Sequence, residues 1–485
     1  MVFQVDGQSE IIVKNKYNMR YIKSYNNTTD LRTDLAAGKL DHPYVAKINN
    51  TIDFNSITTN WENEYFTIIA LTDGTISYSH KEGSNPMFYS INEGEWIETT
   101  VSVDISVSKN DMIRFKSNRG NQAYNQETFT SGGTAQFAVA GNLMSLVAGD
   151  NFATYVPYTS ATGTDGELYC SFKNFFGNCK GLISAKNLII KYCDNESFSN
   201  FFNGCTNLLI PPELPATTLA GACYQYMFEG CTSLTKAPKL PATTLADYCY
   251  SNMFQGCTSL TTAPELPSTT LKTYCYGYMF NGCTSLTTAP TLPATTLADG
   301  CYSGMFGNTN VLPDCSNIDF ASSTVVASGG LIGLFAGTKV TDNDLERLLP
   351  KNDNGRYYLP ATTLAKYCYC CMFEGCPNLT TAPELPATTL ANSCYQQMFY
   401  NCTSLTTAPE LPATTLADYC YNYMFCDCTK LNYIKMLATN ISASMCLDYW
   451  VNRVSSTGTF VKNTAMTRLP RGTSGIPSGW TVQNA

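Results

Sequence analysis

Few residues in this chain have the type and spacing that catalysis or metal binding requires. His42 and His80 are its only histidines, and no partner at ligand spacing recurs near either of them. We interpret both as surface or turn residues. The sequence therefore predicts no enzyme activity, no catalytic residue, no metal site and no cofactor.

The 22 cysteines could form disulfides or bind soft metal ions, but most of them recur at a fixed step along the chain. Cys370, Cys371 and Cys426 fall outside that step. Because a free cysteine packs as a small apolar residue, we interpret the recurring set as buried thiols. Disulfides between repeats and a soft-metal site are the two alternatives.

Two polar segments, residues 342–344 and 352–355, carry the Asp and Asn side chains that calcium sites use. Neither continues into the full loop pattern with its closing bidentate Glu. Helix capping and turn formation explain both segments better.

The residues just described lie within a repeat that governs the C-terminal two-thirds of the chain. Its unit reads L-P-A-T-T-L-A-x-x-C-Y-x-x-M-F-x-G-C-T-S-L-T-T-A-P-x. Met227, Met253, Met279 and Met305 are each 26 residues apart, and a second series begins at Met372. A short fixed period indicates stacked units that bury their apolar faces against each other.

The recurring apolar positions should form the core of the stack. The C-Y-x-x-M-F segment has helical spacing and the T-S-L-T-T-A-P segment looks extended, so each coil is predicted to hold one short helix and one short strand. In the first clear copy, the predicted core residues are Leu219, Cys223, Met227, Phe228, Cys231 and Leu234.

One interval breaks the register, because Met305 and Met372 are 67 residues apart. Residues 334–338 resemble a degenerate M-F-x-G-C-T core, which predicts a distorted coil with extra loop. Residues 341–350 are typical of a short capped helix that ends at a proline.

The N-terminal part has a different pattern. Residues 29–38 predict one helix, capped at its start and ended by glycine. Residues 53–125 favour antiparallel strands, since residues 101–108 alternate apolar and polar side chains. Turn signals at residues 73–74 and 93–94 predict hairpins. A small β-sandwich is the natural interpretation.

The predicted fold class is multidomain α+β, an N-terminal segment and small antiparallel β-sandwich followed by a leucine-rich-repeat solenoid. Residues 1–52 form the attachment or oligomerisation segment and residues 53–130 the sandwich. Residues 131–485 form the solenoid of 26-residue coils, with caps at both ends and an irregular insertion near residues 306–358. Residues 131–134 resemble a linker.

Composition excludes two classes of partner. The net charge is −8, and no run of Lys or Arg could neutralise phosphates, so we expect no nucleic acid. No stretch approaches the roughly 20 apolar residues of a membrane span, so we expect no membrane insertion. The first residues lack an apolar signal core, which indicates a chain that stays in the cytosol where it is made.

Positions that vary between copies should face solvent. These are the residue before each Met and the residue after each Pro, where tyrosine and charged side chains gather. A solvated edge is the simpler interpretation, and a strip that contacts glycan or protein is the functional one. The predicted ligand-contact strip consists of Tyr226, Tyr278, Tyr423, Glu213, Lys239, Glu265, Glu384 and Glu410.

The repeat unit resembles the BspA-type leucine-rich repeats of gut Bacteroides and of the phages that infect them, over roughly residues 136–485. Residues 34–46 are similar to the N-termini of phage virion proteins from the same setting. The family resemblance implies surface display and binding and carries no catalytic residues.

The expected function is therefore that of a non-enzymatic virion protein, a phage head or tail fibre or decoration subunit on the virion surface. Residues 1–52 would attach it to other virion proteins, and the solenoid would contact a host surface glycan or protein. A homo-oligomer is expected, with a trimer as one form. The alternative is a bacterial cell-surface adhesin, located on the outer surface or outside the cell. An enzyme on a solenoid scaffold has no supporting residues.

Overall fold

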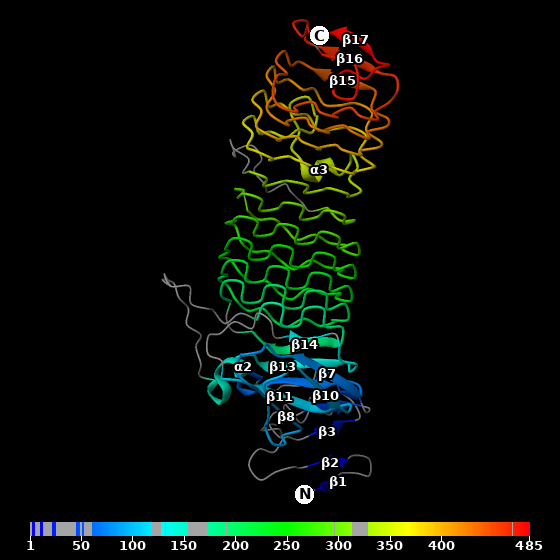
Figure 1. Ribbon diagram of the computed structural model, residues 1–485. Helices are drawn as coiled ribbons and strands as arrows, with labels where there is room; N and C mark the ends of the chain where they lie inside the picture. The colour runs from blue at the N-terminus through cyan, green and yellow to red at the C-terminus, as the bar shows by residue number, and fades with distance from the viewer. Residues whose placement is uncertain are drawn as a thin grey trace.

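The computed structural model describes a long, narrow molecule with its two termini at opposite ends (Figure 1). It describes the backbone of five short strands within residues 1–52, and beyond them the following ranges: 61–118, 128–130, 132–153, 172–190, 193–294, 296–312, 328–467 and 469–485. The helix predicted over residues 29–38 lies outside the described residues.

The N-terminal strands form two small sheets. In the first, β1 (Val2–Gln4) pairs antiparallel with β2 (Glu10–Ile12). In the second, β4 (Val45–Ile48) lies between β3 (Ile22–Tyr25), which is parallel to it, and β5 (Thr51–Ile52), which is antiparallel.

Two larger sheets follow. The first has six strands in the order β14 (Leu182–Ile189), β13 (Phe137–Asn142), β6 (Phe66–Ala70), β11 (Met112–Lys116), β8 (Met87–Ile91) and β9 (Ile97–Thr99). The second has three, in the order β10 (Val103–Val107), β7 (Gly74–Ser79) and β12 (Thr128–Phe129). The 3-10 turns η1 (Trp61–Asn63) and η2 (Gly149–Asn151) and the short helix α2 (Ser145–Ala148) complete this region.

The two sheets meet through aromatic side chains. Phe129 of the three-stranded sheet lies 5.8 Å from Phe66 and 5.2 Å from Phe115, ring centre to ring centre, and both of those belong to the six-stranded sheet. The alternation predicted for β10 is present, because Ile105 and Val107 are buried while the residues between them face outward. Apolar burial between facing sheets is what stabilises this arrangement.

The two predicted hairpins have different outcomes. The turn at residues 93–94 connects β8 and β9, which pair antiparallel, so this hairpin is confirmed. The turn at residues 73–74 joins β6 to β7, which belong to different sheets, so the hairpin predicted there is wrong. Gly74 has a φ of 146°, which permits the change of direction between the sheets.

The six-stranded sheet extends across residue 130, where the sequence analysis divided the chain. Strand β13 pairs antiparallel with β6 and parallel with β14. The predicted linker is bound to β7, since the Thr75 amide donates to the Thr134 hydroxyl at 3.0 Å. Ser184 of β14 then bridges to Ile210 in the first coil, so one ladder leads from the sheet into the repeats.

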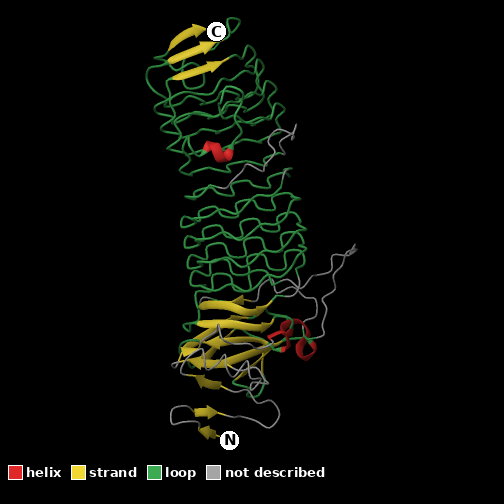
Figure 2. Ribbon diagram, turned by 180° about the vertical axis from the view of Figure 1, so that it is seen from behind, coloured by secondary structure: helices red, strands yellow, loops and turns green. Residues whose placement is uncertain are grey.

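The coils consist of consecutive turns, and the helix predicted in each coil is wrong. Around Met227, φ is positive at every fourth residue, at Ala222 (51°), Tyr226 (57°) and Gly230 (69°). This left-handed conformation interrupts any right-handed helix. Among the described residues, α-helix is limited to α2 and the four-residue α3 (Leu345–Leu348), so the chain is mostly strand and turn (Figure 2).

Alternate amides bond within and between coils. The Met227 amide donates to the Tyr224 carbonyl of its own coil at 3.2 Å. The next amide, that of Phe228, donates to the Met253 carbonyl of the following coil at 2.9 Å. Each coil therefore needs its neighbour to satisfy half of the backbone donors on this face.

The predicted core of the stack is confirmed, with every predicted position of the first clear copy buried. Each side chain lies on its counterpart in the next coil. Phe228, Phe254 and Phe280 stack with ring centres 5.6 and 5.8 Å apart and nearly parallel planes. Such aromatic pairs add to the free energy gained from apolar burial.

The irregular interval holds one distorted coil, as predicted. The Ser328 amide bonds the Asp299 carboxylate 29 residues earlier, and the Ser328 hydroxyl bonds the Lys366 carbonyl 38 residues later. Two unequal steps of 29 and 38 residues thus replace the regular step and account for the 67-residue interval. The predicted helix in residues 341–350 is present as α3. Residues 313–327 of the predicted insertion lie outside the described part.

The C-terminal end closes with a parallel sheet of β15 (Tyr433–Met436), β16 (Thr459–Lys462) and β17 (Thr481–Asn484). Trp450 is fully buried there and donates its indole N–H to the Gly475 carbonyl at 2.9 Å. Trp480 donates likewise to the Ser455 carbonyl at 2.7 Å. Both indoles are thus anchored where the stack ends.

Candidate functional site

The eight predicted strip residues occupy two rows on each coil. Tyr226, for example, is 13 residues from both Glu213 and Lys239, which is half of a 26-residue coil. We call the positions before Met the tyrosine row and the positions after Pro the charged row. The contacts described below lie within each row, and a strip that combines the two rows remains a prediction.

The tyrosine row owes its outward direction to the backbone. Tyr226, Tyr278 and Tyr423 all have left-handed φ values, of 57°, 55° and 53°. Each precedes a buried Met, so the left-handed turn directs the tyrosine away from the core. A non-glycine residue in this conformation costs about 1–2 kcal/mol, and the stacked neighbours must offset that cost.

Sequence reasoning missed a second tyrosine row four residues earlier, just before the first cysteine of each coil. Tyr248 and Tyr274 belong to it and stack with ring centres 5.3 Å apart and planes inclined by 3°. Both have positive φ values, and Tyr248 is 41% exposed. The signal in the sequence was the tyrosine that recurs in A-D-Y-C, one position before a buried residue.

Glycines complete these two rows. Gly300 and Gly304 follow Tyr274 and Tyr278 in the next coil, and both glycines are buried. A methyl group added at Gly300 would overlap the Tyr274 ring, and one at Gly304 would overlap the Tyr278 ring. The rings therefore lie over bare backbone, which fixes their orientation at the surface.

A second tyrosine pair lies near the C-terminal end. Tyr423 stacks on Tyr449 with ring centres 5.3 Å apart, and Tyr449 is 44% exposed. Met445, in the same coil as Tyr449, is 52% exposed. Tyr449 and Met445 were also missed, because this last coil keeps little of the repeat consensus.

In the N-terminal coils, the charged row borders a groove. Glu213, Lys239 and Glu265 are all exposed, in agreement with the prediction that these positions face solvent. Two of the three line a groove of about 430 Å³ beside the start of the stack. Its walls are formed by Lys186, Pro211, Pro212, Glu213, Leu214, Pro215, Pro238, Lys239 and Pro241.

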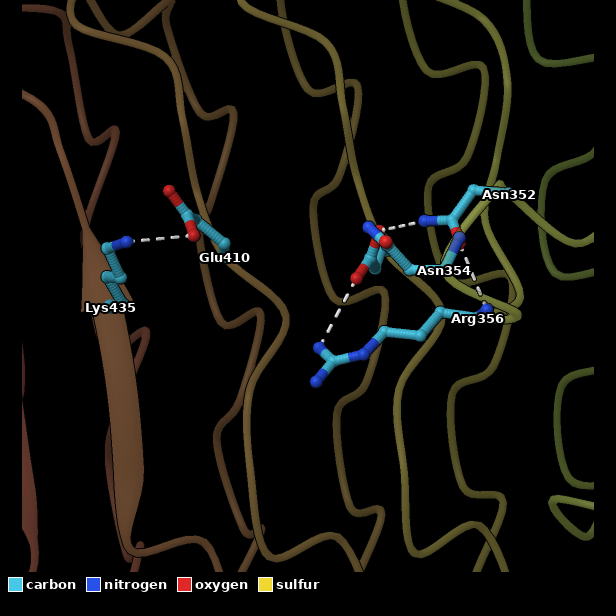
Figure 3. Close-up of polar contacts among 6 residues, drawn as sticks. Asn352, Asn354, Arg356, Glu410 and Lys435 are labelled. Carbon is cyan, nitrogen blue, oxygen red and sulfur yellow. Dashed lines mark hydrogen bonds and ion pairs between the residues drawn. The ribbon is translucent and has the colours of Figure 1, made fainter.

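Further along, the charged row is engaged within the chain (Figure 3). The Glu384 carboxylate accepts from the Asn352 amide at 2.6 Å and pairs with Arg356 at 3.3 Å. Glu410 pairs with Lys435 at 2.9 Å. These pairs are largely exposed, so each contributes little to stability, but they occupy carboxylates that were predicted to contact a ligand.

The acidic segment at residues 342–344 forms turn and inter-coil hydrogen bonds, and the helix cap predicted there is wrong, because Asp344 at the N-cap of α3 makes no side-chain cap hydrogen bond. The Asp342 carboxylate accepts from the amides of Thr380 and Thr381 at 2.8 and 3.1 Å. Burial alone would raise the pKa of Asp342, but these hydrogen bonds outweigh it and lower the pKa. Asp344 accepts from the Thr341 amide at 2.9 Å.

In the described parts of the chain, no three His, Cys, Asp or Glu side chains come together as a metal site. The described cysteines are free thiols, and all of them are buried except the half-buried Cys193 and Cys371. His80, which was predicted to be a surface or turn residue, is instead buried beside Tyr78. His42 lies outside the described residues.

A family model for the BspA type leucine rich repeat region matches residues 221–322 and 362–457, in six copies. The interval between the two matches contains the distorted coil and α3. No curated protein and no solved structure matches the chain. The repeats are thus of the BspA leucine-rich type, which is typical of surface or adhesin-type proteins.

Proposed function

We propose that this chain is a non-enzymatic surface protein. Its BspA-type repeats form a continuous leucine-rich-repeat solenoid that follows a β-sandwich. The solenoid binds a partner on a cell surface. The partner is a surface glycan or a protein. The observation that carries the proposal is the two tyrosine rows, in which the exposed Tyr248, Tyr278 and Tyr449 lie over glycine or over another tyrosine ring. Tyrosine offers a flat apolar face and a hydroxyl, and it loses little conformational entropy on binding.

The N-terminal cluster of these rows is the proposed centre of contact. Tyr248 lies in one coil and Tyr274 and Tyr278 lie in the next, and the backbone of all three is fixed by inter-coil hydrogen bonds. A rigid aromatic surface avoids the ordering cost that a flexible loop would incur on binding. The proline-lined groove with Glu213 and Lys239 is the second candidate surface.

The test is a binding titration of fluorescently labelled protein on cells of a candidate host. Replacing Tyr248, Tyr274 and Tyr278 together by Asn keeps a residue that tolerates positive φ and removes the rings. We expect the apparent affinity to fall about tenfold or more, because each aromatic contact contributes roughly 0.5–1.5 kcal/mol. Cells pretreated with periodate or with protease distinguish a glycan partner from a protein.

The matched control is Glu265→Gln, which changes the charged row half a coil away. If the triple Asn variant still binds cells and Glu265→Gln does not, the binding site lies on the charged row and not on the tyrosine rows. Equal binding by all three proteins would reject both surfaces.

For the carrier of this surface, we propose a phage particle, with the chain as a head or tail fibre or decoration subunit on the virion surface. Residues 1–52 attach it to other virion proteins, and it assembles as a homo-oligomer, for which a trimer is one form. The similarity of residues 34–46 to virion proteins supports this choice. A bacterial cell-surface adhesin is the alternative, and the BspA-type repeats support a surface or adhesin-type protein.

Neither proposal includes nucleic acid or membrane insertion. The net charge of −8 disfavours contact with phosphates. Within the described ranges, the structure contains no helix with the length and apolar character of a membrane span.

A further inference from the structure

Two adjacent thiols, Cys370 and Cys371, lie side by side in the first regular coil after the distorted one. Their sulfur atoms are 3.4 Å apart. Cys371 is half-buried, and Cys370 is 7% exposed. This pair therefore has an opening to solvent, which the buried cysteines of the recurring set do not have.

Both cysteines depart from the repeat. In the regular coil around Met253, the corresponding positions hold Ser251 and Asn252. The core of the coil is unchanged, because the Cys368, Met372 and Cys376 side chains are buried as in other copies. The stack therefore does not require cysteine at these two positions.

The surroundings of the pair leave room on one side. In the preceding coil, the counterpart of Cys371 is Gly333, which has no side chain to cover the thiol. In the following coil, the Gln397 amide oxygen lies 3.6 Å from the Cys371 sulfur. A small group can thus approach the two sulfurs from the Gly333 side.

Geometry disfavours a disulfide between the two. Adjacent Cα atoms are about 3.8 Å apart, below the roughly 4.4–6.8 Å that disulfides usually span. A disulfide here would be strained and easily reduced. The neighbouring Cys370 thiol and burial also raise the pKa of Cys371, which keeps it protonated and slow to attack a disulfide.

We propose that Cys370 and Cys371 form a dithiol site for trivalent thiophilic acceptors, the class represented by organic arsenicals. A pyramidal As(III) centre accepts two sulfurs on one side, as this pair presents them, whereas a linear two-coordinate ion needs sulfurs on opposite sides. With phenylarsine oxide, two As–S bonds form, and the As=O bond and both S–H bonds break. The oxygen leaves with both protons as one water, and arsenic stays trivalent.

The test uses the full chain with phenylarsine oxide as the probe. Intact-mass measurement should show one phenylarsenic group per folded chain, reversed by 2,3-dimercaptopropanol and not by an equal concentration of a monothiol. The variant Cys370→Ser with Cys371→Asn restores the residues of the regular coil, so it should fold. The phenylarsenic adduct should be lost from this variant, because both sulfurs that hold the arsenic have been removed.

Cys193 provides the control, because it is the other half-buried thiol among the described cysteines and interacts with Cys223. In Cys193→Ser, binding should be unchanged. Binding that is lost in Cys193→Ser and retained in the double variant would overturn the proposal, and so would the absence of any adduct on the wild-type chain. Iodoacetamide mapping of the protected peptide identifies the site independently of affinity.

Discussion

Six of the cysteines that recur along the repeat each donate a hydrogen bond to a backbone carbonyl of the preceding coil. Each of these carbonyls also accepts a backbone amide. The Cys257 sulfur lies 3.0 Å from the Phe228 carbonyl oxygen, 29 residues earlier, and Cys205, Cys231, Cys283, Cys402 and Cys428 repeat this contact. The same Phe228 carbonyl accepts the Cys231 amide. A thiol suits the position because it is small and apolar yet retains one weak donor.

Alkaline pH should destabilise the repeats through these thiols. Burial raises the pKa of Cys179 to about 11 and that of Cys283 to about 12, from 9.0. The unfolded chain therefore releases protons above pH 9 that the folded chain retains. The free energy of unfolding is fully maintained below pH 9 and falls as the pH rises toward the folded values, by about 1.4 kcal/mol per pH unit for each such thiol.

Urea denaturation from about pH 8 to about pH 10.5 measures this slope. Cys283→Ala removes one thiol and should reduce the slope by one proton, at the cost of some stability at every pH. A slope that stays at zero above pH 9 would mean that the thiols are already ionised or oxidised in the folded protein.

At this scale, the sequence predicted the core well and the surface incompletely. Recurring apolar residues such as Leu219 and Met227 had to face inward, because only the stack could bury them. The exposed Tyr248 and the half-buried Tyr274 were missed, since tyrosine one position before a buried cysteine looks like core. Their left-handed φ is set by the next coil and not by local preference.

The coil itself is the element in which the sequence prediction was wrong. The spacing of C-Y-x-x-M-F matches a helix, because two apolar residues recur three and four positions apart. A chain of four-residue turns has nearly the same spacing, and each turn ends at a left-handed residue. Tyrosine and glutamine at those positions favour neither the helix nor the turns by local preference. The backbone hydrogen bonds to the next coil select the turns.

Because each coil bonds only to its neighbours, whole coils should be removable. Deleting residues 240–265 brings Phe228 against Met279 in place of Met253 and preserves every type of contact. We expect a folded chain with a cooperative thermal transition. Deleting only residues 240–252 removes half a coil, so residues that occupy different positions of the repeat come to lie against each other. The region should then unfold. Circular dichroism with thermal melting distinguishes the two variants, and equal damage from both would refute the stacking of equivalent coils.

Over the whole molecule, the six-stranded sheet is the junction between the N-terminal part and the repeats. A linker was predicted at residues 131–134 from their small polar composition, but the hydrogen bond from the Thr75 amide to the Thr134 hydroxyl ties this stretch to β7. Composition predicts flexibility and does not reveal a partner strand distant in sequence. The repeats were predictable over a long range because they recur, whereas in the single-copy N-terminal sheets the alternation of β10 and the turn at residues 93–94 were predicted but the division between the sheets was not.

Attachment is the whole-molecule property to test. A chain that begins at Asp53 keeps the larger sheets and all coils, and we expect it to fold and to bind cells as the full chain does. It should no longer join virions, because the proposed attachment segment is gone. Mass spectrometry of purified virions and of outer-membrane fractions measures the location of both chains. If the shortened chain joins virions at normal occupancy, the attachment segment lies elsewhere in the chain. If the full chain is recovered only from outer membranes, the adhesin proposal is favoured.

The hydrogen bonds along the turn face also give the rod a direction. The amides of Tyr226 and Phe228 both point toward the following coil, and the carbonyls that receive them point back. A second copy that extended this ladder could therefore join only head to tail, which is an open arrangement without a two-fold axis. The chain closes this route itself, since Thr473 and Ser474 take up the amides of Val451 and Tyr449. The proposed homo-oligomer would then form by copies that pack side by side around the long axis, and not by end-to-end extension of this ladder.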